Sequence, residues 1–284
     1  MHVRRFLLEN EKGQQFRMDN LDEGCFLTSP SGLGYSYNVN FVQLGYDFIE
    51  NNRKINQQIL KGTAYFKSYN MVKNFIDYVE SAKNLKWIYK IPFENEEKIF
   101  YRDVVITKLD KTEKSGRWLA CSIEFASKSL WYEQNETIFK IKPQINETRW
   151  NFNWNTVFND NSSQSINYEN KSHTDAPITL EIDGPVSNPN FEIYVNGELI
   201  QEVKIKVNIL KYEKLIYNSK ENEFSITKIK TDGTKESLFD LDIIDFKNNN
   251  VICIPQNKIC ELRIRADNTI ENAKLTIYPQ YKCV

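Results

Sequence analysis

One stretch of this chain has a clear helical period: residues 69–83, which read YNMVKNFIDYVESAK. Its apolar side chains recur at intervals of three or four, which places them along one stripe of an α-helix. The stripe consists of Tyr69, Val72, Phe75, Ile76, Val79 and Ala82. Ser68 stands directly before it, and serine is a favoured N-cap because its hydroxyl accepts a hydrogen bond from the first turn. The sequence therefore predicts one amphipathic helix over residues 69–83.

Strand patterns flank this helix on both sides. Before it, Val3–Leu8 and Gln14–Met18 surround the turn Glu11-Lys12-Gly13 and predict a hairpin. After it, the strand candidates are Lys86–Ile91, Lys98–Lys108 and Arg117–Ser127. We expect the helix to cover the apolar face of an antiparallel sheet.

A longer strand pattern lies between the N-terminal hairpin and the helix. Residues 35–42 alternate between apolar and polar side chains, and a second run extends from Arg53 to Phe66. The polar residues Glu50, Asn51 and Asn52 supply the expected turn between the two runs. The pattern predicts one long antiparallel ribbon across Tyr37–Phe66.

The second half of the chain reads as many short strands separated by Asn, Asp and Gly turns. The candidates are Trp150–Phe158, Ser165–Glu169, Ile178–Ile182, Phe191–Val195, Val203–Ile209, Lys214–Tyr217, Glu223–Lys228, Val251–Ile254, Glu261–Ala266 and Ala273–Tyr278. This pattern is typical of a jelly-roll β-sandwich. The expected fold class is therefore mainly β, with an antiparallel β domain carrying one packed helix, followed by a β-sandwich.

The length of 284 residues favours two domains, because single cores stop growing beyond roughly 250 residues. We place a first domain at residues 1–134, a linker at residues 135–147 and a β-sandwich at residues 148–284. The linker contains Pro143, although Thr137–Lys142 also fits a strand belonging to either side. The charged segment Gln201–Lys235 fits an extended arm or a hairpin.

Composition argues against several classes of partner. Lys and Arg total 37 against 38 Asp and Glu, for a net charge of -1, and no basic run of five residues occurs. Nucleic-acid recognition and membrane-surface binding both require clustered positive charge, so neither is expected. The first ten residues contain a short apolar run, whereas a signal peptide needs about 7 to 15 apolar residues. The five cysteines form no C-x-x-C pair, so we expect reduced thiols and no zinc site.

Patterns that carry catalysis or bind metals are missing from the sequence. The two histidines are His2, at the terminus, and His173, in a polar loop. Carboxylate clusters are interpreted as solvated turns, and Asp19–Glu23 lacks the ligand spacing and glycine of a calcium loop. The expectation is a protein that is not an enzyme and has no cofactor or metal, with an unrecognised hydrolase as the least favoured class.

One aromatic pattern leaves an alternative open. Trp150, Phe152 and Trp154 alternate with asparagines and give one strand an aromatic face. Sugars stack on such faces, although core packing produces the same pattern. The alternative function is therefore a carbohydrate-binding β-sandwich accessory protein acting in host-surface recognition, with Trp150 and Trp154 as glycan contacts.

Several short motifs follow one another in a fixed order through the first half. They are Phe66-Lys67-Ser68-Tyr69, Leu85-Lys86-Trp87-Ile88-Tyr89-Lys90, Tyr101-Arg102-Asp103-Val104, Leu109-Asp110-Lys111-Thr112-Glu113-Lys114 and Ser129-Leu130-Trp131-Tyr132. In order and spacing they resemble the N-terminal domain of siphophage distal tail proteins (Dit). Residues 175–189, DAPITLEIDGPVSNP, are similar to the start of the C-terminal domain core in the same family.

The resemblance implies a structural component of a phage tail tip or baseplate, made in the bacterial host cytoplasm. The N-terminal domain would form a homohexameric ring that continues the tail tube, with a galectin-like C-terminal sandwich on its outside. The implied partners are further copies of the chain, the tail tube protein, the tail-associated tip protein and, in some phages, receptor-binding proteins. A free phage, a prophage and a phage-derived particle would all use the same part.

The expected ribbon supplies candidate subunit contacts. It carries apolar side chains on both faces, namely Phe41, Tyr46, Phe48, Ile55 and Ile59. A ribbon that is apolar on both faces has more surface to bury than one small domain covers, which favours a neighbouring subunit. A head-to-tail contact of this kind closes a ring.

Overall fold

The structure is a computed structural model of the whole chain, and it describes residues 5–93, 96–113, 116–139, 164–239, 244–246, 251–267, 270 and 272–284. The chain divides into two compact units, one made of Met1–Glu133 with Tyr281–Val284 and the other of Gln134–Gln280. Each unit has its own apolar core. The described residues form many strands and one α-helix, which confirms the expected, mainly β fold class.

The first unit is built on a nine-stranded sheet with the order β2-β1-β7-β8-β9-β6-β3, beside which β10 pairs with β8 and β25. Its strands are β1 (Arg5–Asn10), β2 (Gln15–Arg17), β3 (Phe26–Ser31), β6 (Ile59–Phe66), β7 (Leu85–Phe93), β8 (Glu96–Lys111), β9 (Leu119–Ser127), β10 (Trp131–Tyr132) and β25 (Gln280–Tyr281). The pairing of β1 with β2 confirms the expected N-terminal hairpin.

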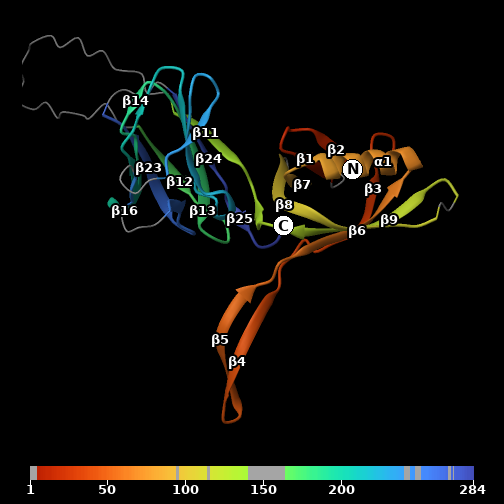
Figure 1. Cartoon of the computed structure of the whole chain (residues 1–284). Coiled ribbons are helices and arrows are strands. Elements are labelled where there is room, and N and C mark those ends of the chain that lie inside the picture. The colour runs from red at the N-terminus through yellow and green to blue at the C-terminus, as the bar shows by residue number, and fades with distance from the viewer. Residues whose placement is uncertain are drawn as a thin grey trace, which may run out of the picture. The chain divides into compact units, whose positions relative to one another are not determined.

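Helix α1 (Tyr69–Ser81) packs on this sheet (Figure 1). The hydroxyl of Ser68 accepts a hydrogen bond of 3.3 Å from the backbone N–H of Met71, which confirms the expected N-cap. The helix buries Val72, Phe75 and Val79 in the core of the first unit. The other large members of the predicted stripe, Tyr69 and Ile76, are exposed, so the buried stripe is narrower than the sequence predicted.

The expected long ribbon is a shorter hairpin that forms a separate two-stranded sheet. It consists of β4 (Tyr37–Leu44) and β5 (Asp47–Ile55), and we call it the arm. The turn lies at Gly45-Tyr46, where Leu44 pairs with Asp47, and Glu50–Asn52 lie within β5. The predicted turn was therefore wrong. The second run divides between the end of β5 and β6, because β6 pairs with β9 and β3 in the large sheet.

The second unit is a β-sandwich whose two sheets share one apolar core. One sheet contains β11 (Asn135–Phe139), β13 (Ala176–Asp183), β18 (Lys214–Asn218), β19 (Ser225–Ile229), β20 (Lys235–Ser237), β22 (Cys253–Ile254) and β24 (Asn272–Ile277). The other contains β12 (Gln164–Glu169), β15 (Asn190–Val195), β16 (Glu198–Ile205), β21 (Ile244–Phe246) and β23 (Ile259–Arg265). The short strands β14 (Val186–Ser187) and β17 (Asn208–Ile209) pair with each other, and a 3-10 turn covers Glu221–Glu223.

Three expectations about chain organisation differ from the structure. Part of the expected linker is a strand, because Asn135–Phe139 pairs along its length with β24. At the other end, Tyr281–Val284 belongs to the first unit, so the second unit is an insertion between two segments of the first. Residues 201–235 form no separate arm, since their strands are built into the sandwich.

Candidate subunit-contact surface

The distribution of apolar side chains on the two faces of the arm changes along its length. The inner half of the arm consists of residues 37–40 and 52–55. On one face, Tyr37 pairs with Ile55 and Val39 pairs with Arg53. On the opposite face, Asn38 pairs with Lys54 and Asn40 pairs with Asn52. This inner half is therefore apolar on one face only, because successive residues of a strand point to opposite sides.

A β-bulge separates the inner half of the arm from its outer half. The register shifts between Asn40 and Phe41, where β5 carries one extra residue. Beyond the bulge, Phe41 and Phe48 lie on one face, since Phe41 pairs with Glu50 and Phe48 pairs with Gln43. Val42 and Ile49 pair directly, on the other face. The outer half is apolar on both faces.

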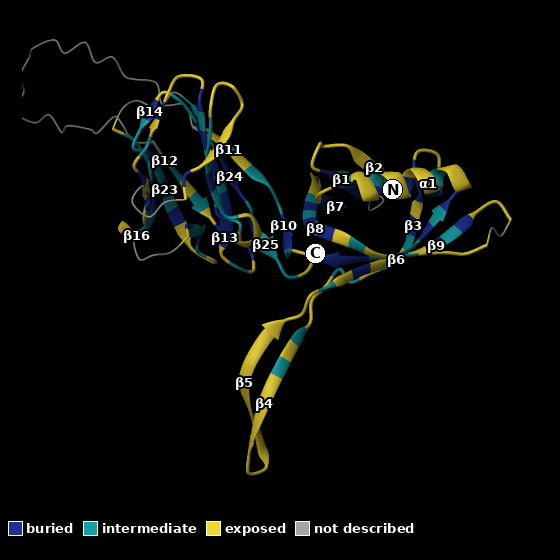
Figure 2. Cartoon of the chain, in the orientation of Figure 1, coloured by how far each residue is buried: buried dark blue, intermediate teal, exposed yellow. Residues whose placement is uncertain are grey.

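These apolar side chains are exposed to solvent (Figure 2). Phe41 is 58% exposed, Phe48 is 67% exposed, and Tyr46 at the turn is fully exposed. Ile55 and Ile59, the remaining predicted contacts, are each 41% exposed; Ile55 ends the arm, whereas Ile59 begins β6. Large apolar side chains that cluster on a surface mark a site of interaction.

The base of the arm is fixed to the sheet by a compact set of hydrogen bonds. The backbone N–H of Asn56 donates to the carbonyl of Ser36 at 2.9 Å, closing the two strands. The side-chain amide of Gln57 donates to the carbonyl of Ser127, and the N–H of Ser127 donates to the carbonyl of Gln58, both at 2.9 Å. At Gly32, with φ of +82°, a Cβ would approach the carbonyl oxygen of Ile59 to 2.0 Å, so glycine is required there.

Two sequence motifs, residues 101–104 and residues 129–132, meet beside this base. The Arg102 guanidinium donates from Nε to the carbonyl of Ser129 at 3.0 Å, and the backbone N–H of Asp103 donates to the Ser129 hydroxyl at 2.9 Å. The indole of Trp131 donates to the carbonyl of Leu33 at 3.0 Å, in the loop that leads into the arm. The segment that leaves the first unit and the base of the arm are thereby held together.

Arg102 is an unusual member of this cluster because it is almost fully buried. Its side chain lies 5.2 Å from the centre of the Trp131 ring, and no ion pair is formed with it among the residues that the structure describes. Burial lowers the pKa of Arg102 to about 10, because desolvation disfavours the charged form. Its Nη1 atom has no hydrogen-bond partner in the described part of the chain.

A groove lies on the first unit at the end of α1. It has a volume of about 260 Å³ and is lined by Val79, Glu80, Ala82, Lys83, Leu85, Val104, Val105, Ile106 and Lys128. The lining is mixed, because Glu80, Lys83 and Lys128 stand beside aliphatic residues. Val79, Leu85 and Val104 are buried, whereas Val105 is 47% exposed. No sequence pattern indicates this groove, because the end of the helix and the middle of β8, which form it, are far apart in sequence.

The described residues contain no group of three or more side chains placed to hold a metal ion. The acidic side chains of Asp19–Glu23 form ion pairs with basic side chains instead. Arg17 binds Asp19 at 3.0 Å and Glu23 at 2.9 Å, while Lys67 binds Asp22 at 2.6 Å. In the described ranges, no helix has the length and apolar character needed to cross a membrane.

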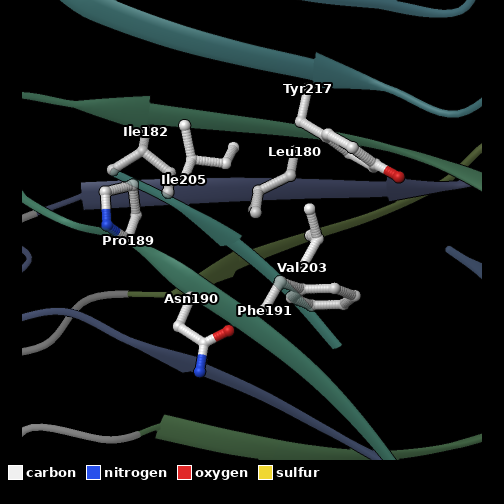
Figure 3. A pocket seen from close by; sticks show the side chains of 8 residues that line it. All are labelled: Leu180, Ile182, Pro189, Asn190, Phe191, Val203, Ile205 and Tyr217. Carbon is white, nitrogen blue, oxygen red and sulfur yellow. The ribbon is translucent and has the colours of Figure 1, made fainter. Parts of the chain in front are cut away.

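The core of the second unit contains a small gap, shown in Figure 3. Its volume is about 10 Å³, room for about one water molecule. Leu180, Phe191 and Tyr217 are among the side chains that line it, so it is a feature of core packing. Trp150 and Trp154, the proposed glycan contacts, lie outside the described residues. Nothing in the described residues favours a carbohydrate site.

Comparison with known families identifies the first unit. The family model described as "Distal tail protein, N-terminal domain" matches residues 5–128. Residues 5–128 therefore form a distal tail protein N-terminal domain. A protein that carries this domain is a structural component of the phage tail tip, or baseplate hub, and is located at the virion tail tip.

Solved structures show a similar fold over the whole length of the chain, or nearly all of it. A chain of the phage P2 baseplate in its activated conformation with Ca is 16% identical, with a TM-score of 0.68 and full coverage of both chains. A chain of the same baseplate with Sr gives the same values. The SPP1 Dit (gp 19.1) protein is 9% identical, with a TM-score of 0.55 over 96% of this chain and 98% of that chain. No curated protein matches the sequence.

Proposed function

We propose that this protein assembles into a homohexameric ring that joins the tail tube to the tail-associated tip protein. The second unit, as a galectin-like sandwich, is proposed to lie on the outside of the ring and to hold receptor-binding proteins in phages that carry them. The role is structural, without turnover of a substrate.

The outer half of the arm is the observation that supports this proposal most directly. Phe41 and Phe48 on one face, and Val42 and Ile49 on the other, remain exposed in the single chain. Burying apolar surface stabilises by about 25 cal/mol per Å² of area removed from water. A second copy that covers the arm therefore gains free energy that one chain alone does not.

Ring formation is tested by measuring mass in solution. The purified protein is expected to show a hexamer by light scattering or native mass spectrometry, and a ring by negative-stain microscopy. The substitution Phe48→Ser removes a large exposed apolar contact without touching either core. We expect it to raise the concentration at which rings dissociate by about tenfold or more, equivalent to about 1.4 kcal/mol.

Phe239→Ser is the matched control, since Phe239 is 62% exposed and belongs to the second unit. It is expected to leave the ring intact. A protein that stays monomeric at high concentration, with tail tube and tip proteins present, would overturn the proposal. Equal loss of rings in the two variants would show that the arm is not the contact.

A further inference from the structure

One turn of the second unit, Leu210-Lys211-Tyr212-Glu213, carries two large side chains that are exposed to solvent. It directly follows β17, whose partner strand β14 is labelled in Figure 1. Leu210 is 63% exposed and Tyr212 is 77% exposed, and neither belongs to the core of the second unit. Packing within the described part of the chain therefore does not account for these side chains.

Tyr212 also has an unfavourable backbone conformation, with a φ of +71°. The N–H of Glu213 donates to the carbonyl of Leu210 at 3.0 Å, which makes Tyr212 the third residue of a hydrogen-bonded turn. A positive φ at the third residue alone is the pattern of a type II turn, which favours glycine or asparagine at that position. A tyrosine is strained there, and strained residues of this kind cluster at functional sites.

Contacts with the rest of the second unit hold the turn in this conformation. The buried Glu213 carboxylate accepts hydrogen bonds from the N–H of Leu210 and from Lys228, each at 2.7 Å. The N–H of Gly184 donates to the carbonyl of Glu213 at 2.9 Å, and a Cβ at Gly184 would approach the carbonyl oxygen of Leu210 to 2.1 Å. The turn is thus fixed, and a fixed aromatic residue binds a partner with little loss of conformational entropy.

The charge of the turn indicates the kind of partner that fits it. The Lys211 ammonium lies 5.1 Å from the centre of the Tyr212 ring, and Lys211 forms no ion pair with the described residues. The acidic residue of the turn, Glu213, is already paired with Lys228. The turn therefore presents two apolar side chains beside one unpaired positive charge. An apolar socket bordered by carboxylates on another protein complements this combination.

We propose that residues 210–213 are the point on the second unit where a separate tail protein docks, with Leu210 and Tyr212 in an apolar socket and Lys211 facing a carboxylate. This inference rests on the proposed function, in which the second unit holds receptor-binding proteins, and it names the surface that they contact. A second copy of the chain is the less suitable occupant, because the arm, which is the proposed ring contact, belongs to the first unit.

The substitution Tyr212→Gly separates a docking role from a structural one. Glycine adopts positive φ without strain, so the melting temperature is expected to stay the same or rise although the ring is removed. The probe is the purified receptor-binding protein of the same particle, and calorimetry measures its binding to the full-length protein. We expect Tyr212→Gly to raise the Kd by about tenfold or more, and Tyr212→Phe, which keeps an aromatic ring, to raise it by less than about threefold.

Ile259→Ser is the matched control. Ile259 is 65% exposed on the same unit, but it belongs to β23, which does not pair with β17. This variant is expected to leave the Kd unchanged. Lys211→Glu is expected to raise the Kd several-fold, by a factor that shrinks as salt is added, because exposed charges are screened.

Three results would contradict the docking point. Equal Kd values for the unmodified protein and Tyr212→Gly would overturn it and leave the proposed function standing. Loss of the oligomer by mass in Tyr212→Gly would also overturn it, because the turn would then be a contact between copies of the chain. If the receptor-binding protein does not bind the unmodified protein, the docking point and the holding role proposed for the second unit are both wrong.

Discussion

At the scale of single residues, the cysteines show how environment decides reactivity. Burial raises the pKa of the Cys25 and Cys121 thiols, and it raises the pKa of Cys253 to about 11. Cys260 is also buried, with a raised pKa, whereas Cys283 is exposed. The thiolate is the reactive form, so buried thiols with raised pKa values react slowly.

Titration of the native protein with a thiol reagent at pH 8 is therefore expected to show one fast equivalent. Cys283→Ser is expected to remove this fast phase, and denaturation is expected to expose the other thiols. A second fast equivalent in the native protein would contradict the slow reaction expected of the four thiols with raised pKa values.

A charged pair in the second unit predicts a dependence of stability on pH. Lys228 donates to the Glu213 carboxylate at 2.7 Å, and the N–H of Leu210 donates to it at the same distance. The hydrogen bond from Lys228, followed by that from Leu210, lowers the pKa of Glu213 below its ordinary value. A lowered folded-state pKa contributes stability that is present above the unfolded pKa and lost as pH falls through the folded pKa.

The melting temperature of the protein is therefore expected to fall as the pH drops below about 4.5, the ordinary pKa of a glutamate, and to fall less steeply in Glu213→Gln. Glu236→Gln is the control, because Glu236 forms an exposed pair with Lys230. Its melting profile is expected to follow that of the unmodified protein. Identical slopes for all three proteins would show that the Glu213 pair does not contribute.

At the scale of elements, α1 shows the strength of local sequence signals. Its N-cap and its buried residues Val72, Phe75 and Val79 were all among the residues that the sequence singled out. The interval of three or four residues is a property of the helix itself, so it can be recognised without knowing the rest of the fold.

The N-cap of this helix is expected to contribute measurably to stability. Ser68→Ala removes the hydroxyl that accepts from Met71, and it should lower the free energy of unfolding by about 1 kcal/mol. Urea denaturation measures this difference. Lys73→Ala, an exposed change in the middle of the helix, is expected to alter stability by less than about 0.5 kcal/mol.

The arm is an element whose outer half is expected to be dispensable for folding. Replacing residues 41–51 by Asn-Gly would join Asn40 to Asn52, which face each other in the hairpin. The shortened protein is expected to be monomeric and to keep its melting temperature within a few degrees, because the removed side chains are exposed. A ring that forms without these residues would contradict the role proposed for the arm.

At the scale of the whole molecule, two separate segments of the chain, Met1–Glu133 and Tyr281–Val284, make up the first unit. After the second unit, Tyr281 packs its ring edge-on against Phe100 at 5.5 Å, and its hydroxyl donates to Glu133 at 3.2 Å. Lys282 lies 5.6 Å from the ring of Tyr37, at the base of the arm. The last residues thereby complete the first unit.

A fragment of residues 1–133 is accordingly expected to be less stable than the same fragment joined by a glycine-serine linker to residues 281–284. The difference is expected to be about 1 kcal/mol or more, because an edge-on aromatic pair contributes about 0.5–1.5 kcal/mol beyond its buried area. Denaturant titration of both fragments measures it. A third fragment with Tyr281→Ser in the added segment should lose most of the gain.

The sequence by itself determined the helix, its cap, most strands of both units and the scarcity of catalytic groups, because periodicity and residue type are local properties. Only the tertiary structure decided that the turn of the arm lies at Gly45-Tyr46, that Ile59 starts a strand of the large sheet, and that Asn135–Phe139 joins the second unit. It also decided that Tyr281 returns to the first unit and that a groove forms beside Val105. Each of these features depends on which distant strand pairs with which, and many registers are compatible with the same alternation of apolar and polar residues.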